Sequence, residues 1–278
     1  MTQKTVFISG ATSGIGLVTA QKLQALGWKI YAGGLVGDDF SVLGDRIQPL
    51  PFDITDANGV AEAVTHLNDE ITHLDALINN AGIQVSGAIE ALSMDTFQRQ
   101  FDVNVMGHLQ VTKALLPLLR KADAARIVNV SSLMGQVAMP MLGAYSMSKH
   151  ALEALSDVLR MELKPFGIHV AVVEPAAIAT PMSDRAYTDL VALRDNSSQQ
   201  IQDDYQAHFE GMIATLQSQT KNATSPDLIA DVIIHALSAR NPKARYAIGI
   251  DVKALSTIRK MLPTWLGDWI LMRALGIK

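Results

Sequence analysis

The chain alternates between short apolar runs and longer stretches in which apolar residues recur at helical spacing. Runs that are apolar at nearly every position are typical of strands buried on both faces of a sheet. We expect such strands at 5–9, 29–33, 75–79, 126–130 and 169–174, and weaker ones at 47–54 and 245–249.

Helical spacing predicts helices between these strands. One is expected at 15–27, ending at Gly27, another opens on Thr55, and a long one opens on Ser93 and runs over 93–122. Ser and Thr are favourable N-caps, and glycine is common just after a helix. The alternation predicts an α/β fold with a doubly wound parallel sheet of about seven strands flanked by helices.

A single domain is expected over 1–278, because no linker or internal repeat divides the chain. Residues 181–224 interrupt the alternation with a polar, helix-prone insertion, which we interpret as a substrate loop placed to cover a ligand. Ser225-Pro226 marks the start of the next helix.

The apolar C-terminal extension, 251–278, allows two interpretations. Pro263 and Gly267 argue against one continuous helix, and the apolar stretch 265–272 is too short to cross a bilayer. The extension either packs on its own domain or on a second subunit, or it guards the substrate entrance and rests on a membrane surface.

Composition narrows the function classes. The chain is 49% hydrophobic and 18% charged, and its net charge of −4 comes without a basic block, which argues against nucleic acid as a partner. It has no cysteine, so disulfides and thiolate metal sites are excluded, and no paired-histidine motif suggests a metal. The N-terminus lacks the pattern of a signal peptide, so we expect a cytoplasmic protein.

The first strand leads into the turn SGATSGIG, with Gly10, Gly14 and Gly16 before an apolar-periodic helix. Such glycines permit a tight turn and a close approach of the backbone to a pyrophosphate, while the helix N-terminus attracts phosphates. A glycine-rich turn also serves as plain structural punctuation, but its place after the first strand favours nucleotide binding.

Tyr145 and Lys149 lie four positions apart in AYSMSKHALEAL. On a helix the two side chains share one face, and a nearby ammonium lowers the pKa of a phenol, which suits an acid or base near neutrality. The alternative is an ordinary surface pair on an amphipathic helix.

Together with the glycine turn and this YxxxK pair, the motifs NNAG (79–82), FDVNVMG (101–107) and VNVSSLMG (128–135) resemble those of the short-chain dehydrogenase/reductase family, in the family's order. The resemblance covers nearly the whole chain. It implies a single-domain Rossmann fold and NAD(P)-dependent oxidoreduction between an alcohol and a carbonyl. It also leads us to expect a homodimer or homotetramer.

The resemblance assigns four catalytic residues. Tyr145 matches the acid/base, and Lys149 matches the residue that holds the nicotinamide ribose and lowers the pKa of the tyrosine. Ser132 matches the hydroxyl that orients the substrate carbonyl, and Asn104 matches the asparagine that supports a proton-relay water. The alternative for Asn104 is a buried structural residue bonded to the backbone.

The resemblance also places cofactor contacts along the carboxyl ends of the strands. Asp53, Asn80, Ala81 and Gly82 resemble adenine-side and mid-sheet contacts, and Thr180 resembles the hydroxyl that holds the carboxamide. The full expected set is Gly10, Thr12, Ser13, Gly14, Ile15, Gly16, Gly34, Leu35, Asp53, Ile54, Asn80, Ala81, Gly82, Tyr145, Lys149, Pro175, Ile178 and Thr180.

The choice between NAD and NADP depends on the loop after the second strand. Gly34 stands where NAD-preferring relatives carry Asp, Leu35 where many NADP-preferring ones carry Arg, and Ser13 where NADP enzymes often have a cation. Without a cation, a 2′-phosphate is poorly compensated, and Asp38 and Asp39 would repel it. We therefore favour NAD.

The chain resembles in particular the branch with retinol, hydroxysteroid and larger 3-hydroxybutyrate dehydrogenases. An apolar alcohol or ketone, such as a steroid, a retinoid or an acyl chain, is thus the first substrate class. One departure from the family pattern is Ala176, which follows Pro175 where a glycine is usual and narrows the site. The expected substrate contacts are Leu133, Met134, Met141, Ala176 and Met182, although the methionines could equally be core residues.

Two alternatives stay open at this point. The enzyme could instead reduce acyl-thioesters or small polar ketones, or the chain could be a non-catalytic dinucleotide-binding regulator that kept the fold. The intact set of Asn104, Ser132, Tyr145 and Lys149 argues against the regulator.

Overall fold

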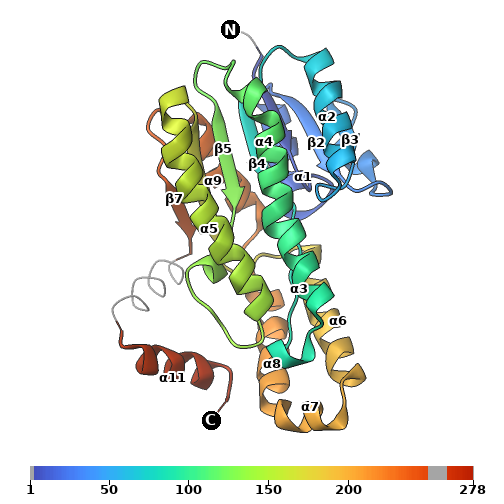
Figure 1. Cartoon of the computed structure of the whole chain (residues 1–278), viewed down its shortest axis with the longest axis vertical. Helices are drawn as coiled ribbons and strands as arrows, with labels where there is room; N and C mark the ends of the chain where they lie inside the picture. Colours follow the sequence, from blue (N-terminus) through green and yellow to red (C-terminus); the bar gives the residue numbers. More distant parts are fainter. Residues whose placement is uncertain (1–2, 250–261, 278) are drawn as a thin grey trace.

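The computed structural model describes residues 3–249 and 262–277. Its centre is one parallel sheet with the strand order β3-β2-β1-β4-β5-β6-β7 (Figure 1). The order reverses between β1 and β4, and ligands of such sheets bind outside the carboxyl ends of the strands at this point. The predicted strands are confirmed as β1 (Thr5–Ile8), β2 (Lys29–Gly34), β3 (Ile47–Pro51), β4 (Ala76–Asn79), β5 (Arg126–Val130), β6 (His169–Pro175) and β7 (Arg245–Ile248).

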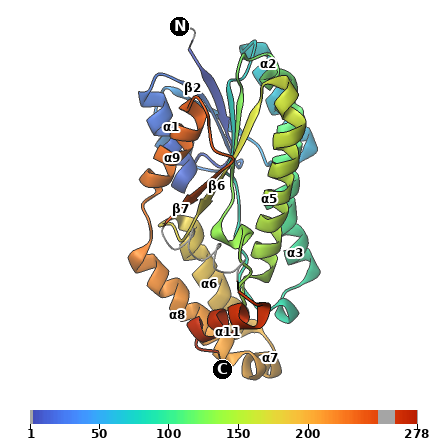
Figure 2. The same ribbon diagram turned by 90° about the vertical axis from the view of Figure 1, so that its left-hand side faces the viewer.

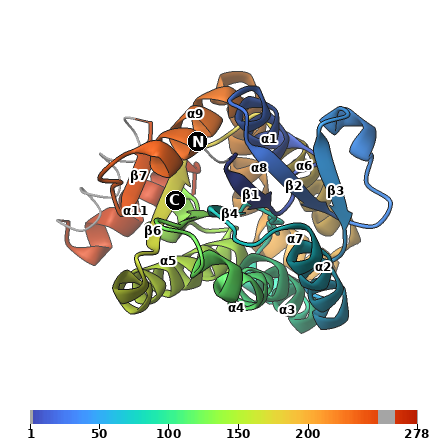
Figure 3. The same ribbon diagram turned by 90° about the horizontal axis from the view of Figure 1, so that it is seen from above.

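Helices cover both faces of the sheet, as Figure 3 shows. On one face α1 (Gly14–Ala25) and α9 (Pro226–Ser238) lie side by side, and on the other lie α2 (Ala57–Glu70), α4 (His108–Leu119) and α5 (Gly143–Leu163). Consecutive residues of a strand point to opposite faces of the sheet. Ile8 therefore packs in the apolar cluster on the side of α1 and α9, and Phe7 packs in the cluster on the side of α2, α4 and α5. Both faces of the central strands are buried, which explains why these strands are apolar at nearly every position, whereas the edge strands β3 and β7 are partly exposed.

The helix starts agree with the predictions at two of three positions. Ser93 caps α3 (Met94–Phe101), and Ser225 caps α9. The expected start at Thr55 is wrong, because the Asp56 carboxylate accepts the amides of Asn58 and Gly59 and caps α2 one residue later. Gly27 follows α1 with φ +85°, the left-handed conformation that favours glycine.

The long helix predicted over 93–122 is interrupted. Between α3 and α4, residues Asp102–Gly107 (η3) form a π-helical segment, which carries Asn104. Gly107 within it faces Ile54, to which a Cβ built on the glycine would come within 2.7 Å. Short 3-10 turns occur at Phe40–Leu43 (η1), Ile89–Ala91 (η2), Leu133–Gly135 (η4) and Lys164–Phe166 (η5).

The predicted insertion forms a helical layer beyond the carboxyl ends of the strands (Figures 1 and 2). It consists of α6 (Pro181–Asn196), α7 (Gln199–Asp204) and α8 (Gln206–Asn222). Together with α11 (Thr264–Ala274), these helices enclose a third apolar cluster. Within the described residues, no helix is both long and apolar enough to span a membrane.

The C-terminal extension packs on this layer. Residues 251–261 lie outside the described residues. Within the described part, α11 begins after Pro263, as a helix boundary at that proline predicts, and Gly267 does not interrupt it. Leu275 and Ile277 are buried in the third cluster, and a Cβ built on Gly211 of α8 would overlap the carbonyl of Leu275. The described end of the extension therefore packs on its own chain.

Candidate active site

The glycine turn after β1 has the shape of a phosphate cradle. Gly10 and Gly14 have φ values of +64° and +53°, and a Cβ built on Gly16 would lie 2.2 Å from the carbonyl oxygen of Gly10. No side chain fits at Gly16 without moving the backbone, and α1 begins at Gly14 with its free amide groups directed outward. The turn and helix therefore fit a pyrophosphate of a dinucleotide.

Two polar residues hold this turn against the motif after β4. The Ser9 hydroxyl accepts the amides of Asn80 (3.0 Å) and Ala81 (3.1 Å). The Asn80 amide group donates to the carbonyls of Ser9 (3.0 Å) and Gly10 (2.9 Å), so this predicted cofactor residue braces the cradle. Sequence reasoning missed Ser9, although a polar residue at the end of a buried strand is a usable signal.

The segment after β6 closes the other side of the turn. A Cβ built on Gly14 would lie 3.1 Å from the Thr180 methyl group, so Thr180 stands directly against the cradle. Ile178 is buried, and with Thr180 it lines a cavity of about 300 Å³ along residues 177–184. Neither Ser132 nor Tyr145 lines this cavity, which lies beside the predicted cofactor contacts Ile178 and Thr180. Pro175 ends β6 and is buried, and Ala176 after it is partly exposed.

The predicted catalytic groups come from η4 and α5. Ser132 caps η4, and its hydroxyl is hydrogen-bonded to Tyr145, which lies in the first turn of α5. The Lys149 ammonium lies 5.7 Å from the centre of the Tyr145 ring and donates to the Val130 carbonyl at 2.9 Å. All three side chains are buried, so the surface-pair interpretation of Tyr145 and Lys149 is wrong.

The pKa values differ from the sequence expectation. Burial raises the pKa of Tyr145, although the hydrogen bond from Ser132 lowers it. Burial also lowers the pKa of Lys149 to about 8, against the attraction of the Glu153 carboxylate. The expected lowering of the tyrosine pKa by Lys149 is therefore not found here, because the ammonium is directed at the Val130 carbonyl and burial dominates.

Asn104 is bonded mainly to the backbone. Its side-chain oxygen accepts the Ile83 amide at 2.9 Å, and its nitrogen donates to the Ile83 carbonyl at 2.9 Å and to the Ser148 hydroxyl at 3.2 Å. The side chain thus joins η3 to α5 and to the segment after β4. This geometry is that of the structural alternative, while a relay role for Asn104 stays a prediction.

One turn further on, His108 contacts Ala81, another predicted cofactor residue. The His108 ring nitrogen Nε2 lies 2.7 Å from the Ala81 carbonyl, and burial lowers the pKa of the ring to about 3. The ring is therefore neutral at physiological pH and donates to that carbonyl. Sequence reasoning missed His108, whose signal was its position four residues after Asn104.

The adenosine-side residues gather at the end of β2. A Cβ built on Gly34 would lie 2.7 Å from the Thr12 methyl group, and the Phe52 amide donates to the Gly34 carbonyl, which brings Asp53 to the same place. Leu35 and Ser13 are exposed, whereas Ile15 and Ile54 pack toward the core. The Asp53 carboxylate accepts hydrogen bonds from the backbone amide and the hydroxyl of Thr55.

The substrate-side predictions converge around Tyr145. Met134 and Met141 share the third apolar cluster with Tyr145, and Leu133 packs against it. Met182 is not part of this cluster, and its terminal methyl lies 3.7 Å from a Cβ built on Gly82. Met141 has φ +66°, an uncommon conformation for a side-chain-bearing residue. The cluster also contains Phe209 and Met212 of α8.

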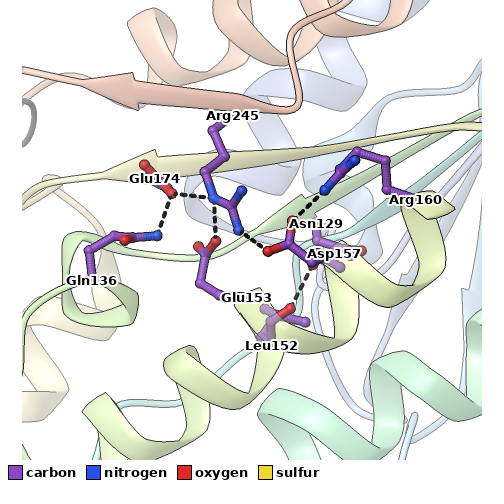
Figure 4. Close-up of polar contacts among 9 residues, drawn as sticks. Asn129, Gln136, Leu152, Glu153, Asp157, Arg160, Glu174 and Arg245 are labelled. Carbon is purple, nitrogen blue, oxygen red and sulfur yellow. Dashed lines mark hydrogen bonds and ion pairs between the residues drawn. The ribbon is translucent and has the colours of Figure 1, made fainter.

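Behind this site, Arg245 of β7 gathers three carboxylates (Figure 4). Its guanidinium pairs with Glu153 (3.0 Å), Asp157 (2.8 Å) and Glu174 (3.3 Å). Gln136, just after η4, donates to Glu174 at 3.0 Å. The network therefore joins β6, β7, α5 and the turn that carries Ser132, and no local sequence signal indicated it.

A glycine turn that fits a phosphate at the switch point of the sheet, together with a buried tyrosine, serine and lysine, is typical of a dinucleotide-dependent oxidoreductase. The comparisons with known proteins agree. The model of the family described as short chain dehydrogenase matches residues 4–190, and the chain belongs to this family. By class it is an NAD(P)-dependent alcohol dehydrogenase or carbonyl reductase.

Similarity to individual proteins extends over nearly the full length. The chain is 35% identical to retinol dehydrogenase 7 of Mus musculus, with 96% of this chain and 87% of the relative covered. It is also 35% identical to 17-beta-hydroxysteroid dehydrogenase type 6 of Bos taurus, over 98% and 88%. A crystal structure of a short-chain dehydrogenase from Streptomyces avermitilis matches with a TM-score of 0.77 and 26% identity, over 96% and 97%.

Proposed function

We propose that the protein interconverts an alcohol and a carbonyl on an apolar substrate of steroid, retinoid or acyl-chain type, with Tyr145 as the acid/base. The observation that carries this proposal is the position of the Tyr145–Ser132 pair inside a cluster of apolar side chains from α6, α8 and the C-terminal end. Apolar side chains with a few convergent polar groups are the usual lining of a site for such ligands.

The chain's own residues account for binding and proton transfer. The bound nicotinamide cofactor supplies the two-electron redox chemistry, and the glycine cradle, Thr180 and Lys149 would hold it. The hydroxyls of Ser132 and Tyr145 hydrogen-bond the substrate oxygen, where charge develops in the transition state. Tyr145 releases a proton to this oxygen in reduction and takes one from it in oxidation.

NAD is the favoured cofactor, because positions 13, 34 and 35 carry no cation for a 2′-phosphate. The proposal is tested by adding long apolar alcohols, small polar ketones and acyl-thioesters with each cofactor and following the nicotinamide absorbance. Turnover of only the polar or thioester compounds would favour the alternative reductase. Dinucleotide binding without any turnover would favour the non-catalytic regulator.

Replacing Lys149 by Met tests the cofactor role of the ammonium. We expect weaker dinucleotide binding, and slower turnover as its consequence, because the variant loses a ribose hydrogen bond from a charged donor. Thermal stability should not fall, since burial already disfavours the charged lysine. Titration of dinucleotide binding and a melting curve check both statements. Unchanged dinucleotide affinity would contradict the role.

Replacing Leu275 by Ala tests whether the C-terminal end forms a wall of the substrate site. The KM for a long apolar substrate should rise by about 10-fold or more, because removing apolar contact from a pocket weakens binding. Trp269→Ala is the matched control, since Trp269 lies on the exposed face of α11. An equal KM in Leu275→Ala and wild type, with a lower melting temperature, would show a packing role only.

The exposed face of α11 also bears on the membrane alternative. It carries Trp265, Trp269 and Ile270, and the Arg273 guanidinium lies over the Trp269 ring. Reduced co-sedimentation of Trp269→Ala with liposomes would support peripheral membrane contact, and unchanged co-sedimentation would argue against it.

The molecular mass of the protein in solution decides between the proposed homodimer, a homotetramer and a monomer.

A further inference from the structure

A tight turn after β2 carries Asp38 back to the end of its own strand. The Asp38 amide donates to the Leu35 carbonyl at 3.0 Å, and Gly37 has φ +102°, which a side chain would disfavour. Val36 at the tip of the turn is exposed. The chain therefore reverses within four residues, and Asp38 comes to lie beside Gly34 and Leu35.

The Asp38 carboxylate fills the space that a side chain at position 34 would occupy. A Cβ built on Gly34 would lie 2.9 Å from Asp38 Oδ2 and 2.7 Å from the Thr12 methyl group. Oδ2 accepts the Thr12 hydroxyl at 2.7 Å and the Leu35 amide at 2.9 Å. Glycine at position 34 is thus what allows a carboxylate from four residues further on to reach the glycine turn.

The two oxygens of the Asp38 carboxylate differ in their partners. Both hydrogen bonds fall on Oδ2, and in the described part of the chain neither a hydrogen bond to Oδ1 nor an ion pair of Asp38 is found. Asp38 is only partly buried, so its free oxygen is accessible at the place where the glycine turn meets the end of β2. The hydrogen bonds that hold the turn use Oδ2 only, so Oδ1 is not needed to stabilise the turn.

We propose that Asp38 is the residue that sets the cofactor specificity of this site. Its carboxylate accepts a hydrogen bond from a ribose hydroxyl of NAD and repels the 2′-phosphate of NADP, in place of the acidic residue that position 34 lacks. This inference rests on the proposed dinucleotide-dependent function. A side chain at Gly34 would collide with Asp38 and Thr12, so Asp38 itself is the position to vary.

Asp39 provides a matched control. Its carboxylate accepts the amide and the hydroxyl of Ser41 at 2.9 and 2.5 Å, and it caps η1 on the surface. Asp38→Asn and Asp39→Asn remove the same charge from neighbouring positions. An effect of overall charge would appear in both variants, whereas a contact of Asp38 with the ribose would appear in only one.

The experiment measures kcat/KM and dissociation constants for NAD and NADP in wild type, Asp38→Asn and Asp39→Asn. For Asp38→Asn we expect the affinity for NAD and its kcat/KM to fall by about 10-fold or more, the contribution of a hydrogen bond to a charged group. The preference should shift toward NADP by at least the same factor. Asp39→Asn should change the ratio by less than about 2-fold, the scale of an exposed charge.

A second variant protects the test against misfolding. Thr12→Val keeps the size of the side chain but removes the donor that orients Asp38, so it should shift the ratio in the same direction by a smaller factor. Equal ratios in wild type and Asp38→Asn, or equal shifts in Asp38→Asn and Asp39→Asn, would overturn the inference. Absence of any dinucleotide binding by wild-type protein would instead overturn the proposed function.

Discussion

Tyr145→Phe is expected to reduce kcat by about 10²–10⁴-fold, the range for loss of a general acid or base. The hydroxyl is the only atom removed, and the ring stays in the apolar cluster with Met134 and Met141, so the fold is kept. The dissociation constant of the dinucleotide should change little, because Lys149 and the glycine cradle remain. Steady-state kinetics and dinucleotide titration measure the two effects separately.

The control for this variant is Ser132→Ala, which removes the hydroxyl bonded to Tyr145. It should also lower kcat, and it should raise the pH at which Tyr145 ionises, since Ser132 lowers the pKa of that phenol. Turnover by Tyr145→Phe within a factor of a few of wild type would reject Tyr145 as the acid/base. If the dinucleotide affinity of Tyr145→Phe fell by the same factor as kcat, the variant would have a structural defect.

The fold was accessible from the sequence because the central strands, β1, β2, β4, β5 and β6, are buried on both faces along nearly their whole length. A run such as RIVNV at 126–130 has no exposed face to alternate with, and β5 coincides with it. Helix ends were harder to place, since Thr55 and Asp56 are both good caps and only the geometry selects Asp56. The π-helical segment at Asp102–Gly107 leaves no mark on the hydrophobic pattern.

The proposed catalytic residues were accessible because they lie close together along the chain or within short motifs. Ser132, Tyr145 and Lys149 come from one turn and one helix, and the structure brings them together. Ser9 and Arg245 act across distances of 70 residues or more in sequence: Ser9 bonds to Asn80 after β4, and Arg245 bonds to Glu153 on α5. Such contacts depend on strand order, which local patterns do not contain.

Arg245→Met is expected to lower the free energy of unfolding by about 3 kcal/mol. Removing one partner of a buried ion pair leaves the other charge uncompensated, at a cost of ~3–5 kcal/mol. The side chains of Glu153 and Glu174 are 7% and 5% exposed, so their desolvation is nearly complete, whereas Arg245 is 34% exposed, which favours the lower end of that range. Denaturant unfolding of wild type and variant measures the difference.

Arg160→Met is the matched control, because Arg160 pairs with Asp157 in the same network (Figure 4) but is 40% exposed. It should cost less than about 1 kcal/mol, as surface pairs do.

The two arginines also hold the pKa of Asp157 below its usual range, Arg245 most strongly. A lowered pKa of a carboxyl group adds stability at pH values above its pKa in the unfolded chain, ~3.9. This stability is lost as the pH falls through the pKa of the group in the folded protein. The stability deficit of Arg245→Met should therefore be largest at neutral pH and narrow below about pH 4, where Asp157 in the unfolded chain and in the variant takes up a proton. Equal deficits for the two arginine variants at pH 7 would show that the buried carboxylates do not depend on Arg245.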